Sequence, residues 1–376
     1  MKNFVTLFNS QNVHLIKDVG LIPYGMYRFE NYESYIATYN NGDYGHLQDA
    51  VKGLKLWFVK KYTGNFTIDS VAFLLKNSKR IDVLNLYHTT FRSAVFSLVY
   101  KRINPNGKIY LKLDGGYTQE ETPWYKAFRR YAMCRADLVT TELKETRGAL
   151  IESWHRQIGL LRNPYHPADL KKYIPYCDRS NTILTVGRIG TPQKNTETLL
   201  KAFLSVSDKI PNWNLLLVGP VESSFRQQME NLFDHDPSLK QRIVLYGNVE
   251  NRDELMQLYS TVKLFVFPSR WESYGIALME AGLCGTFQMC SELPASKELT
   301  NDFEYAVHFP AEDVNSLSEL LEVYCTADNF EMECKAKKER EYIIENCSLE
   351  QVCGQLNKMI DEIYRNSKWE FQAALR

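Results

Sequence analysis

The chain alternates short apolar runs with longer stretches in which apolar residues recur every three or four positions. The short runs are typical of buried parallel strands, and the longer stretches are typical of amphipathic helices. Strands are predicted at residues 4–8, 35–39, 83–87, 108–113, 138–141, 182–186, 214–218, 243–246 and 264–267. Helices are predicted at residues 17–29, 47–62, 124–133, 196–206, 225–233, 252–259, 316–327, 330–346 and 349–365, with one more beginning near residue 276. This alternation predicts an α/β protein with doubly wound parallel sheets.

Length and turn signals predict two domains. The 376 residues are enough for two α/β domains, each with its own core. Residues 163–167 form a turn-rich break, and residues 171–180 are typical of a linker. We therefore expect a first domain at 1–170, a second at 171–348, and a C-terminal helical segment at 349–376 that packs back across the domains.

Charge is distributed unevenly, although the net charge is zero. Residues 1–176 carry 25 Lys and Arg against 15 Asp and Glu, whereas the remainder carries 20 against 30. A basic first half suits an anionic partner, such as a membrane surface or a phosphate-bearing acceptor, but attraction between the two halves explains it equally well. The predicted helix at 47–62 bears Trp57 and four lysines, so it could lie on an anionic membrane or pack on a sheet with a solvated lysine face.

Several classes of protein are disfavoured by missing signals. No apolar run approaches 18 residues, so neither a signal peptide nor a transmembrane helix is expected. Eight Cys without a C-x-x-C pair are typical of reduced thiols in a cytosolic protein. Neither G-x-G-x-x-G nor G-x-x-x-x-G-K-[ST] occurs, which argues against a dinucleotide-dependent dehydrogenase and a P-loop enzyme. Basic, aromatic-interleaved motifs are also missing, so nucleic acid is not an expected partner.

The tripeptide Asp234-His235-Asp236 fits the D-x-D pattern that binds Mn²⁺ in one class of nucleotide-sugar enzymes. It follows a predicted helix and precedes Pro237, and no buried strand leads into it. We therefore interpret it as a helix-ending turn and expect no metal site there.

The stretch at 265–281, FVFPSRWESYGIALMEA, combines a strand, a glycine-bearing turn and a helix start. Such a unit presents free backbone N–H groups that bind phosphate well. Glu272 falls in the turn and Glu280 falls within the helix, so both could contact one long ligand such as a nucleotide-sugar. An ordinary βα unit with a surface glutamate and a helical glutamate fits the spacing equally well.

Four other side chains are candidates because they follow predicted strands. Arg188 and Lys194 follow the strand at 182–186, on the same rim as Glu272, and two converging cations could neutralise a diphosphate without metal. Two solvated surface cations are the alternative. In the first half, His88 and Asp114 each follow a strand, where ligands bind in open α/β sheets. A structural histidine and a turn aspartate remain the alternatives for these two.

Four segments in order resemble the nucleotide-binding domain of retaining glycosyltransferases of family 4, which have the GT-B fold. They are TVGRIGTPQKN at 185–195, LLLVGP at 215–220, VLYGNVENRDELMQLYS at 244–260 and FPSRWESYGIALMEA at 267–281. The resemblance is strong over about 181–350 and covers the first half only in outline. It implies two Rossmann-like domains facing each other across a cleft.

The resemblance also implies roles for individual residues. Arg188 and Lys194 match the family's diphosphate-binding cations, Glu272 matches the glutamate on the donor sugar, and Glu280 matches the glutamate on the ribose. Further donor-binding positions are matched by Gly187, Gly219, Val249, Ser273, Tyr274, Gly275 and Ile276.

The first half departs from the family pattern. Asp114 stands where a catalytic-pocket histidine is expected, and His88 lies one strand earlier, so either could border the donor sugar. Lys17 and Gly20 belong to a segment that replaces the family's Gly-Gly loop on the acceptor side. Asn163 matches the asparagine of a family segment near the domain junction.

The function implied is transfer of a sugar from a nucleotide-sugar, with a UDP-sugar favoured, to a glycan or lipid-linked glycan acceptor. Retained anomeric configuration, no metal and no other cofactor are expected. Family analogy points to bacterial cell-surface polysaccharide or glycoconjugate synthesis, in the cytoplasm or peripherally on the inner face of the membrane. The alternatives are a GT-B sugar-nucleotide epimerase, a sugar-nucleotide-binding pseudoenzyme and a membrane-associated structural protein.

Overall fold

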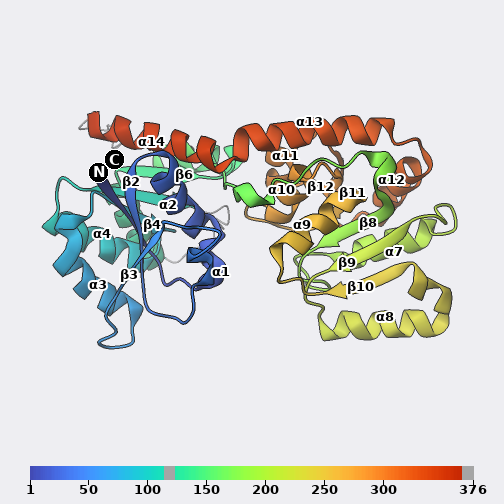
Figure 1. The fold of residues 1–376 in the computed structure, drawn as a ribbon, viewed down its shortest axis with the longest axis horizontal. Coiled ribbons are helices and arrows are strands. Elements are labelled where there is room, and N and C mark those ends of the chain that lie inside the picture. Colours follow the sequence, from blue (N-terminus) through green and yellow to red (C-terminus); the bar gives the residue numbers. More distant parts are fainter. Residues whose placement is uncertain (114–122, 366–376) are drawn as a thin grey trace. The chain divides into compact units, whose positions relative to one another are not determined.

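The computed structural model describes residues 1–113 and 123–365 (Figure 1). The chain forms two compact units, the first from Met1–Pro167 together with the chain from Asn346 onward, and the second from Ala168–Glu345. The chain therefore passes from the first unit to the second and returns near its end.

The first unit is an α/β sandwich around a parallel sheet. Its elements are β1 (Lys2–Leu7), α1 (Asn12–Leu15), α2 (Asp18–Phe29), β2 (Tyr32–Thr38), β3 (Lys55–Phe58), α3 (Phe66–Asn77), β4 (Val83–Tyr87), α4 (Phe91–Ile103), β5 (Lys108–Leu113), α5 (Pro123–Arg135), β6 (Leu138–Thr141), α6 (Lys144–Trp154), β7 (Gly159–Leu160) and α14 (Leu349–Arg365). Within the described residues the strands form a seven-stranded sheet in the order β3-β2-β1-β4-β5-β6-β7.

Alternate residues of these strands enter two different hydrophobic clusters. Leu84 and Leu86 of β4 pack with α3 and α4 in one cluster, whereas Val83 of the same strand packs with α2 and α14 in the other. Because successive strand residues point to opposite faces, the two clusters cover the two faces of the sheet.

The second unit repeats this architecture. Its elements are β8 (Ser180–Val186), α7 (Thr196–Val206), β9 (Asn214–Val218), α8 (Ser223–His235), β10 (Ile243–Gly247), α9 (Arg252–Thr261), β11 (Val262–Phe267), α10 (Ile276–Leu283), β12 (Phe287–Ser291), α11 (Pro294–Leu299), β13 (Val307–Phe309), α12 (Val314–Thr326) and α13 (Phe330–Cys347). In the described part of this unit the strands form a six-stranded parallel sheet, in the order β10-β9-β8-β11-β12-β13.

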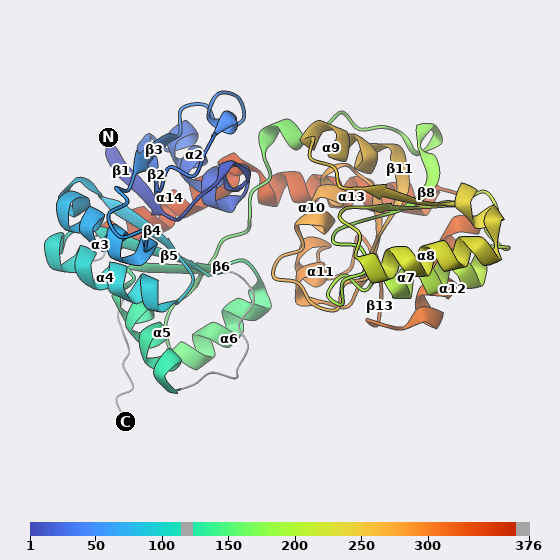
Figure 2. The ribbon, with the colours of Figure 1, turned by 90° about the horizontal axis from the view of Figure 1, so that it is seen from below.

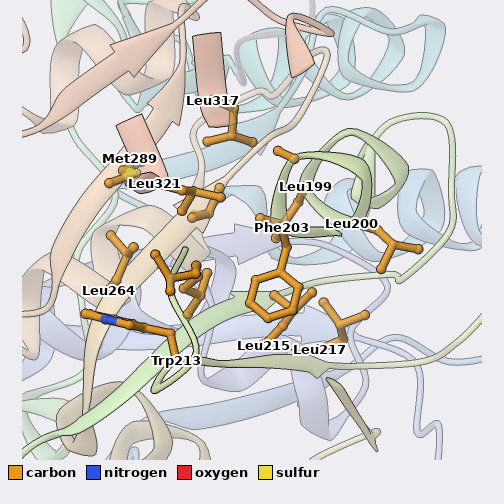
Figure 3. Close-up of a cluster of buried hydrophobic side chains, with 14 of the residues drawn as sticks. Leu199, Leu200, Phe203, Trp213, Leu215, Leu217, Leu264, Met289, Leu317 and Leu321 are labelled. Atoms are coloured by element: carbon orange, nitrogen blue, oxygen red, sulfur yellow. The ribbon is translucent and has the colours of Figure 1, made fainter. Parts of the chain in front are cut away.

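One large cluster fills the face of the second sheet that α7, α8 and α12 cover. Figure 3 shows its centre, where Phe203 of α7 and Leu321 of α12 lie above Leu215 and Leu264 of the strands. All four side chains are fully buried. A core of this size makes the second sheet a rigid platform for the loops that leave its strands.

Most predicted elements are confirmed. The strands at 83–87, 108–113, 138–141 and 214–218 and the helices at 196–206 and 349–365 match the observed bounds. The sequence did not reveal α3, α4, α6, β12 or β13. In α4 the buried face includes Ser93 and Ser97, whose hydroxyls bond backbone carbonyls at 2.8 Å and 2.7 Å, so its apolar period is weak.

The helix predicted at 47–62 is wrong. Residues 45–47 form a single 3₁₀ turn, Gly53 adopts a positive φ of 105° that ends any helix, and residues 55–58 form the edge strand β3. Trp57 packs edge-on against Phe73, with ring centroids 5.1 Å apart. The lysines are therefore spread along a loop and a strand, and neither alternative for an amphipathic helix there, on a membrane or packed on a sheet, applies.

The C-terminal helix α14 packs on the first unit. Its apolar stripe, including Val352, Leu356 and Ile360, is fully buried in the cluster that also contains α2. Gly25 of α2 allows this close packing, because a Cβ there would lie 2.3 Å from Cys353 Sγ.

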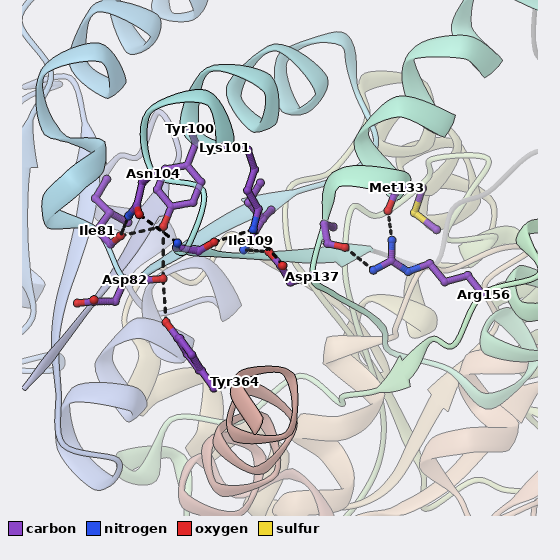
Figure 4. Close-up of polar contacts among 12 residues, drawn as sticks. Ile81, Asp82, Tyr100, Lys101, Asn104, Ile109, Met133, Asp137, Arg156 and Tyr364 are labelled. Atoms are coloured by element: carbon purple, nitrogen blue, oxygen red, sulfur yellow. Dashed lines mark hydrogen bonds and ion pairs between the residues drawn. The ribbon is translucent and has the colours of Figure 1, made fainter. Parts of the chain in front are cut away.

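A polar network closes the edge of the first sheet at which β4 and β5 begin (Figure 4). Tyr364 of α14 donates its hydroxyl to the Asp82 carbonyl at 3.1 Å, and Tyr100 of α4 donates to the Ile81 carbonyl at 2.8 Å. Asp137 accepts from the Ile109 N–H at 2.7 Å and pairs with Lys101 at 2.7 Å. These contacts tie together the end of the sheet at which the strands begin. Open α/β sheets bind ligands at the opposite end, where the strands end.

No helix within residues 1–113 and 123–365 has the length and apolar character that crossing a bilayer requires.

Candidate functional site

The strand order of the second sheet reverses between β8 and β11. These two strands are hydrogen-bonded neighbours and lie side by side in Figure 2. The chain continues from β8 to β9 on one side and from β11 to β12 on the other (Figure 1). Open α/β sheets bind ligands outside the carboxyl ends of their strands at such a switch point. The loops that leave β8 and β11 there carry Arg188, Lys194 and Glu272.

Two glycines let the ends of β8 and β9 approach closely. Gly219 has a φ of 133°, and a Cβ on it would lie 1.9 Å from the Gly187 carbonyl oxygen. A Cβ on Gly187 would lie 3.2 Å from the side chain of Lys194. Both predicted glycines therefore shape the floor of the site, and Gly187 leaves room for the Lys194 stem.

Lys194 and Glu272 form an ion pair between the two loops. The same carboxylate oxygen, Oε1, accepts a hydrogen bond from the Ser269 hydroxyl at 2.8 Å. The Glu272 side chain is 8% exposed and the Lys194 side chain is 19% exposed. Because both side chains are mostly buried, their orientation is set by the surrounding protein. A small part of each side chain remains exposed to solvent.

Buried and bridging hydrogen bonds hold the two loops together around this pair. Asn195, at a φ of 50°, donates its amide to the Pro268 carbonyl at 3.0 Å in the interior. Gln193 donates to the Trp271 carbonyl at 3.1 Å and accepts at 2.5 Å from Arg188. Arg188 is exposed, so its planar cation sits at the rim of the site, beside the Lys194 loop.

The turn before α10 is built for backbone contacts. Gly275 lies at a φ of 83°, the left-handed region that favours glycine, and it caps the helix that begins at Ile276. Tyr274 is 1% exposed and anchors the turn, whereas Ser273 and Ile276 are exposed. The Leu278 N–H donates to the Gly275 carbonyl at 2.9 Å, whereas the Ile276 and Ala277 N–H groups precede the intrahelical hydrogen bonds and can bind a phosphate or hydroxyl.

Glu280 lies deeper than the sequence indicated. It is 4% exposed, and it accepts hydrogen bonds from Arg252 at 2.6 Å and from Tyr259 at 3.1 Å. Arg252 also donates to both oxygens of Asp169, at 2.9 Å and 2.8 Å. Burial raises the pKa of the Glu280 carboxyl above its ordinary value, and the Arg252 charge opposes this.

Arg252, Asp169 and Tyr259 were not predicted as site residues. Arg252 and Tyr259 fall within one of the segments that resemble the family, but their spacing does not reveal that they meet Glu280. Val249, which was predicted, is half-buried and follows β10 on the same edge of the sheet.

His88, one of the predicted residues of the first unit, directly follows β4, at the switch point between β1 and β4 of the first sheet. His88 is exposed, has a φ of 59°, and donates its backbone N–H to the Lys112 carbonyl at 2.9 Å. Asp114 lies outside the described residues. The structure therefore describes only one of these two predicted residues.

Two other predicted residues of the first unit have packing roles, and one is exposed. Gly20 lies inside α2 rather than in a loop, and a Cβ on it would be 2.2 Å from the Leu15 carbonyl oxygen. Asn163 is 7% exposed, in the segment just before the chain enters the second unit. Lys17 is exposed and precedes α2.

A buried lysine at the same edge was missed. Lys112, near the end of β5, is fully buried and pairs with Glu142 at 2.5 Å and with Asp18 at 3.2 Å. Asp18 opens α2 and Glu142 directly follows β6, so three elements deliver one cation and two carboxylates to this edge. A single lysine in an apolar strand gives no sequence signal for such a cluster.

In the described part of the chain, no group of three or more His, Cys, Asp or Glu side chains is arranged to hold a metal ion. The Asp234–Asp236 tripeptide is the helix-ending turn that the sequence indicated. Helix α8 ends at His235, and Asp236 accepts from the Ser238 N–H at 3.0 Å.

Known proteins are similar to this chain in sequence and in fold. Residues 170–348 match the family model described as Glycosyl transferases group 1. An uncharacterized glycosyltransferase of Methanocaldococcus jannaschii is 26% identical over 181 residues, which are 45% of this chain and 45% of that protein. A phosphatidyl-myo-inositol mannosyltransferase of Mycobacterium leprae is 30% identical over 142 residues, 37% of this chain and 36% of that protein. The chain thus spans less than half the length of these two curated relatives.

The crystal structure of Anabaena HepE in complex with UDP is similar in fold, with a TM-score of 0.74 at 14% identity, over 96% of this chain and 100% of that chain. Identity this low shows the fold alone. The predicted fold class, two doubly wound α/β domains of the GT-B type, is confirmed by the two parallel sheets and by this similarity.

Proposed function

We propose that the protein is a retaining glycosyltransferase that uses a nucleotide-sugar donor, because residues 170–348 match the family model described as Glycosyl transferases group 1. The observation that carries this proposal is the Lys194–Glu272 ion pair. It joins the predicted diphosphate cation to the predicted sugar-binding carboxylate at the switch point of the second sheet.

The charges of the site are divided in a way that suits such a donor. Arg188 and Lys194 outweigh Glu272, so that end carries a net positive charge for a diphosphate. At the other end Asp169 and Glu280 outweigh Arg252, which disfavours phosphate and favours hydroxyl donors. A nucleoside diphosphate sugar has a diphosphate beside a sugar and a ribose with two hydroxyls, and it matches this division.

The reaction we propose is displacement at the anomeric carbon from the face that the diphosphate leaves. The bond between the anomeric carbon and the β-phosphate oxygen breaks, a bond to the acceptor oxygen forms on the same face, and the acceptor proton passes to the departing phosphate. Arg188 and Lys194 stabilise the negative charge that grows on the leaving oxygens. Because these side chains supply the positive charge, we expect neither a metal nor another cofactor to be required.

We propose a UDP-sugar as donor and a glycan or lipid-linked glycan as acceptor. The UDP found with Anabaena HepE supports the donor, and the lipid named for the Mycobacterium leprae mannosyltransferase supports the acceptor class. On the same analogy we propose a role in bacterial cell-surface polysaccharide or glycoconjugate synthesis. The protein would act in the cytoplasm or peripherally at the inner face of the membrane.

A thermal-shift screen with UDP-, GDP- and ADP-sugars tests the donor, because a ligand that binds the native state raises Tm. We expect UDP-sugars to give the largest rise, and release of UDP when glycan or lipid acceptors are added. No shift with any nucleotide-sugar would overturn the proposal.

Further measurements separate the three alternatives. A sugar-nucleotide epimerase would convert the donor without an acceptor, which mass spectrometry of donor and enzyme alone detects. A pseudoenzyme would bind a nucleotide-sugar but release nothing with any acceptor. The basic first unit predicts binding to anionic liposomes, which a sedimentation assay measures, and this binding would fit either a transferase on a lipid acceptor or a membrane-associated structural protein.

A further inference from the structure

The Glu280 carboxylate is held from two sides by its own protein. Arg252 Nη1 donates to Oε1 at 2.6 Å, and the Tyr259 hydroxyl donates to Oε2 at 3.1 Å. The Glu280 side chain is 6% exposed and Tyr259 is fully buried. The orientation of the carboxylate is therefore set before any ligand arrives.

Arg252 is itself fixed by a second carboxylate. Its Nε and Nη2 atoms donate to the two oxygens of Asp169, at 2.9 Å and 2.8 Å, which is the bidentate geometry that suits a planar guanidinium. Asp169 is 3% exposed and is the second residue of the second unit. The guanidinium thus spans Asp169 and Glu280 and cannot move away from either without breaking an ion pair to a buried carboxylate.

The hydrogen-bond acceptor sites of the Glu280 carboxylate that Arg252 and Tyr259 do not use indicate the kind of ligand it can bind. A carboxylate offers about four lone-pair sites, two on each oxygen. Arg252 and Tyr259 use one site on each oxygen, which leaves one acceptor site on each. Two acceptor sites on one carboxylate suit two neighbouring hydroxyl donors, and the net negative charge of Asp169, Arg252 and Glu280 together disfavours a phosphate there.

We propose that Arg252, clamped by Asp169, is the positioning residue that orients Glu280 to accept hydrogen bonds from the two ribose hydroxyls of the nucleotide. This inference rests on the proposed function, because it takes Glu280 as the residue that meets the ribose. It adds that ribose recognition is decided one residue further away, by a guanidinium that need not touch the ligand. Arg252 should therefore affect discrimination between ribose and deoxyribose, and should leave the diphosphate end of the site unaffected.

The test compares nucleotides that differ by one hydroxyl. Isothermal titration calorimetry would measure the Kd of UDP, 2′-deoxy-UDP and 3′-deoxy-UDP for the full chain. Hydrogen bonds to a charged group predict that the wild type prefers UDP to each deoxy analogue by about 10- to 100-fold. Arg252→Met should reduce this preference to within about threefold, because Glu280 is then no longer held toward the two hydroxyls.

Two further variants keep the test informative if Arg252→Met folds poorly. Arg252→Lys supplies a cation but no planar fork, and it should restore only part of the preference. Asp169→Asn leaves the contact between Arg252 and Glu280 and weakens the clamp, so an intermediate preference is expected. A merely structural role for Arg252 would lower Tm without changing the ratio of the UDP and deoxy-UDP affinities.

Lys171→Ala is the matched control. Lys171 pairs with Asp253 at 2.5 Å, and Asp253 follows Arg252 at the start of α9. Lys171 also lies two residues after Asp169, in the segment with which the second unit begins. The Lys171→Ala variant should keep the full preference for UDP over the two deoxy analogues. An unchanged preference in Arg252→Met would overturn the inference and leave the proposed function standing. Failure of the wild type to bind UDP, GDP or ADP would overturn both.

Discussion

Lys194 and Glu272 are 78 positions apart in the sequence and form an ion pair at the switch point of the second sheet. Ser269 bonds the same carboxylate oxygen, and Asn195, the residue after Lys194, bonds the Pro268 carbonyl. The loops after β8 and β11 are therefore held together by these contacts. The cation is not a solvated surface lysine, and its charge is oriented by a neighbouring carboxylate.

Lys194→Ala should lower kcat by about 10²–10³, which is typical for the loss of one preorganised group that stabilises a leaving oxygen. The measurement is release of nucleoside diphosphate from the donor in the presence of acceptor. Lys201→Ala is the matched control, because Lys201 is an exposed lysine on α7, the helix that follows the Lys194 loop. Near-normal turnover of Lys194→Ala would sink the assignment of the leaving-group cation.

Gly219→Ala should lower both Tm and donor affinity. The new Cβ would lie 1.9 Å from the Gly187 carbonyl oxygen, and the φ of 133° is unfavourable for alanine. Because the obstacle is backbone, the ends of β8 and β9 must separate, which displaces the loop that carries Lys194. Circular dichroism melting and nucleotide titration measure the two effects.

Gly247→Ala is the control for Gly219→Ala, because it introduces backbone strain without a steric clash. Gly247 also has a positive φ, 89°, but a Cβ there meets nothing within 4 Å. It should cost only about 1–2 kcal/mol of the free energy of unfolding, the usual penalty for a left-handed residue. Equal losses in the two variants would show that the close approach of Gly219 to Gly187 is unimportant.

Lys112→Met should destabilise the first unit by about 3–5 kcal/mol, because it removes a fully buried ammonium that pairs with the carboxylates of Glu142 and Asp18. Adding Glu142→Gln should recover part of the loss, since one of the two carboxylates that Lys112 pairs with is then neutral. Urea denaturation measures the free energy of unfolding. Lys76→Met, which replaces an exposed lysine on α3, should change it by no more than about 0.5 kcal/mol.

Glu339 of α13 predicts a dependence of stability on pH. It is fully buried, and neither carboxyl oxygen has a hydrogen-bond partner within the described residues. Burial raises the pKa of this carboxyl well above its ordinary value of 4.5. Above about pH 4.5 the unfolded chain loses this proton while the folded chain keeps it. The free energy of unfolding should therefore fall as pH rises, by up to about 1.4 kcal/mol per pH unit until the raised pKa is passed.

Glu339→Gln should remove this slope and make the protein more stable than the wild type, with a larger gain at pH 8 than at pH 5. Thermal melting at both values measures it. Glu341→Gln, on the exposed face of the same helix, should leave the slope as in the wild type. A slope that persists unchanged in Glu339→Gln would show that Glu339 does not ionise on unfolding.

The pattern of the sequence by itself determined the order of the elements and much of the second unit. The strands at 214–218 and 264–267 are short apolar runs closed by Gly or Pro, and local sequence carries that signal. The motifs at 185–195 and 267–281 also placed Arg188, Lys194 and Glu272 at strand ends. The interpretation of 47–62 failed because spacing at three and four positions does not register Gly53, whose positive φ ends the helix.

Tertiary structure decided what those residues contact. The Lys194–Glu272 pair exists because β8 and β11 are parallel neighbours, a relation that depends on sheet pairing over 78 positions. Contact among Arg252, Asp169 and Glu280 requires that the first residues of the second unit, α9 and α10 come together. Contact of Lys112 with Asp18 and Glu142 likewise requires that β5, α2 and the residue after β6 come together. Local propensity determines the backbone of each segment, whereas a buried charge is paired by a distant side chain that the fold brings to it. The sequence therefore indicated which candidate residues lie at strand ends, and only the fold paired their charges.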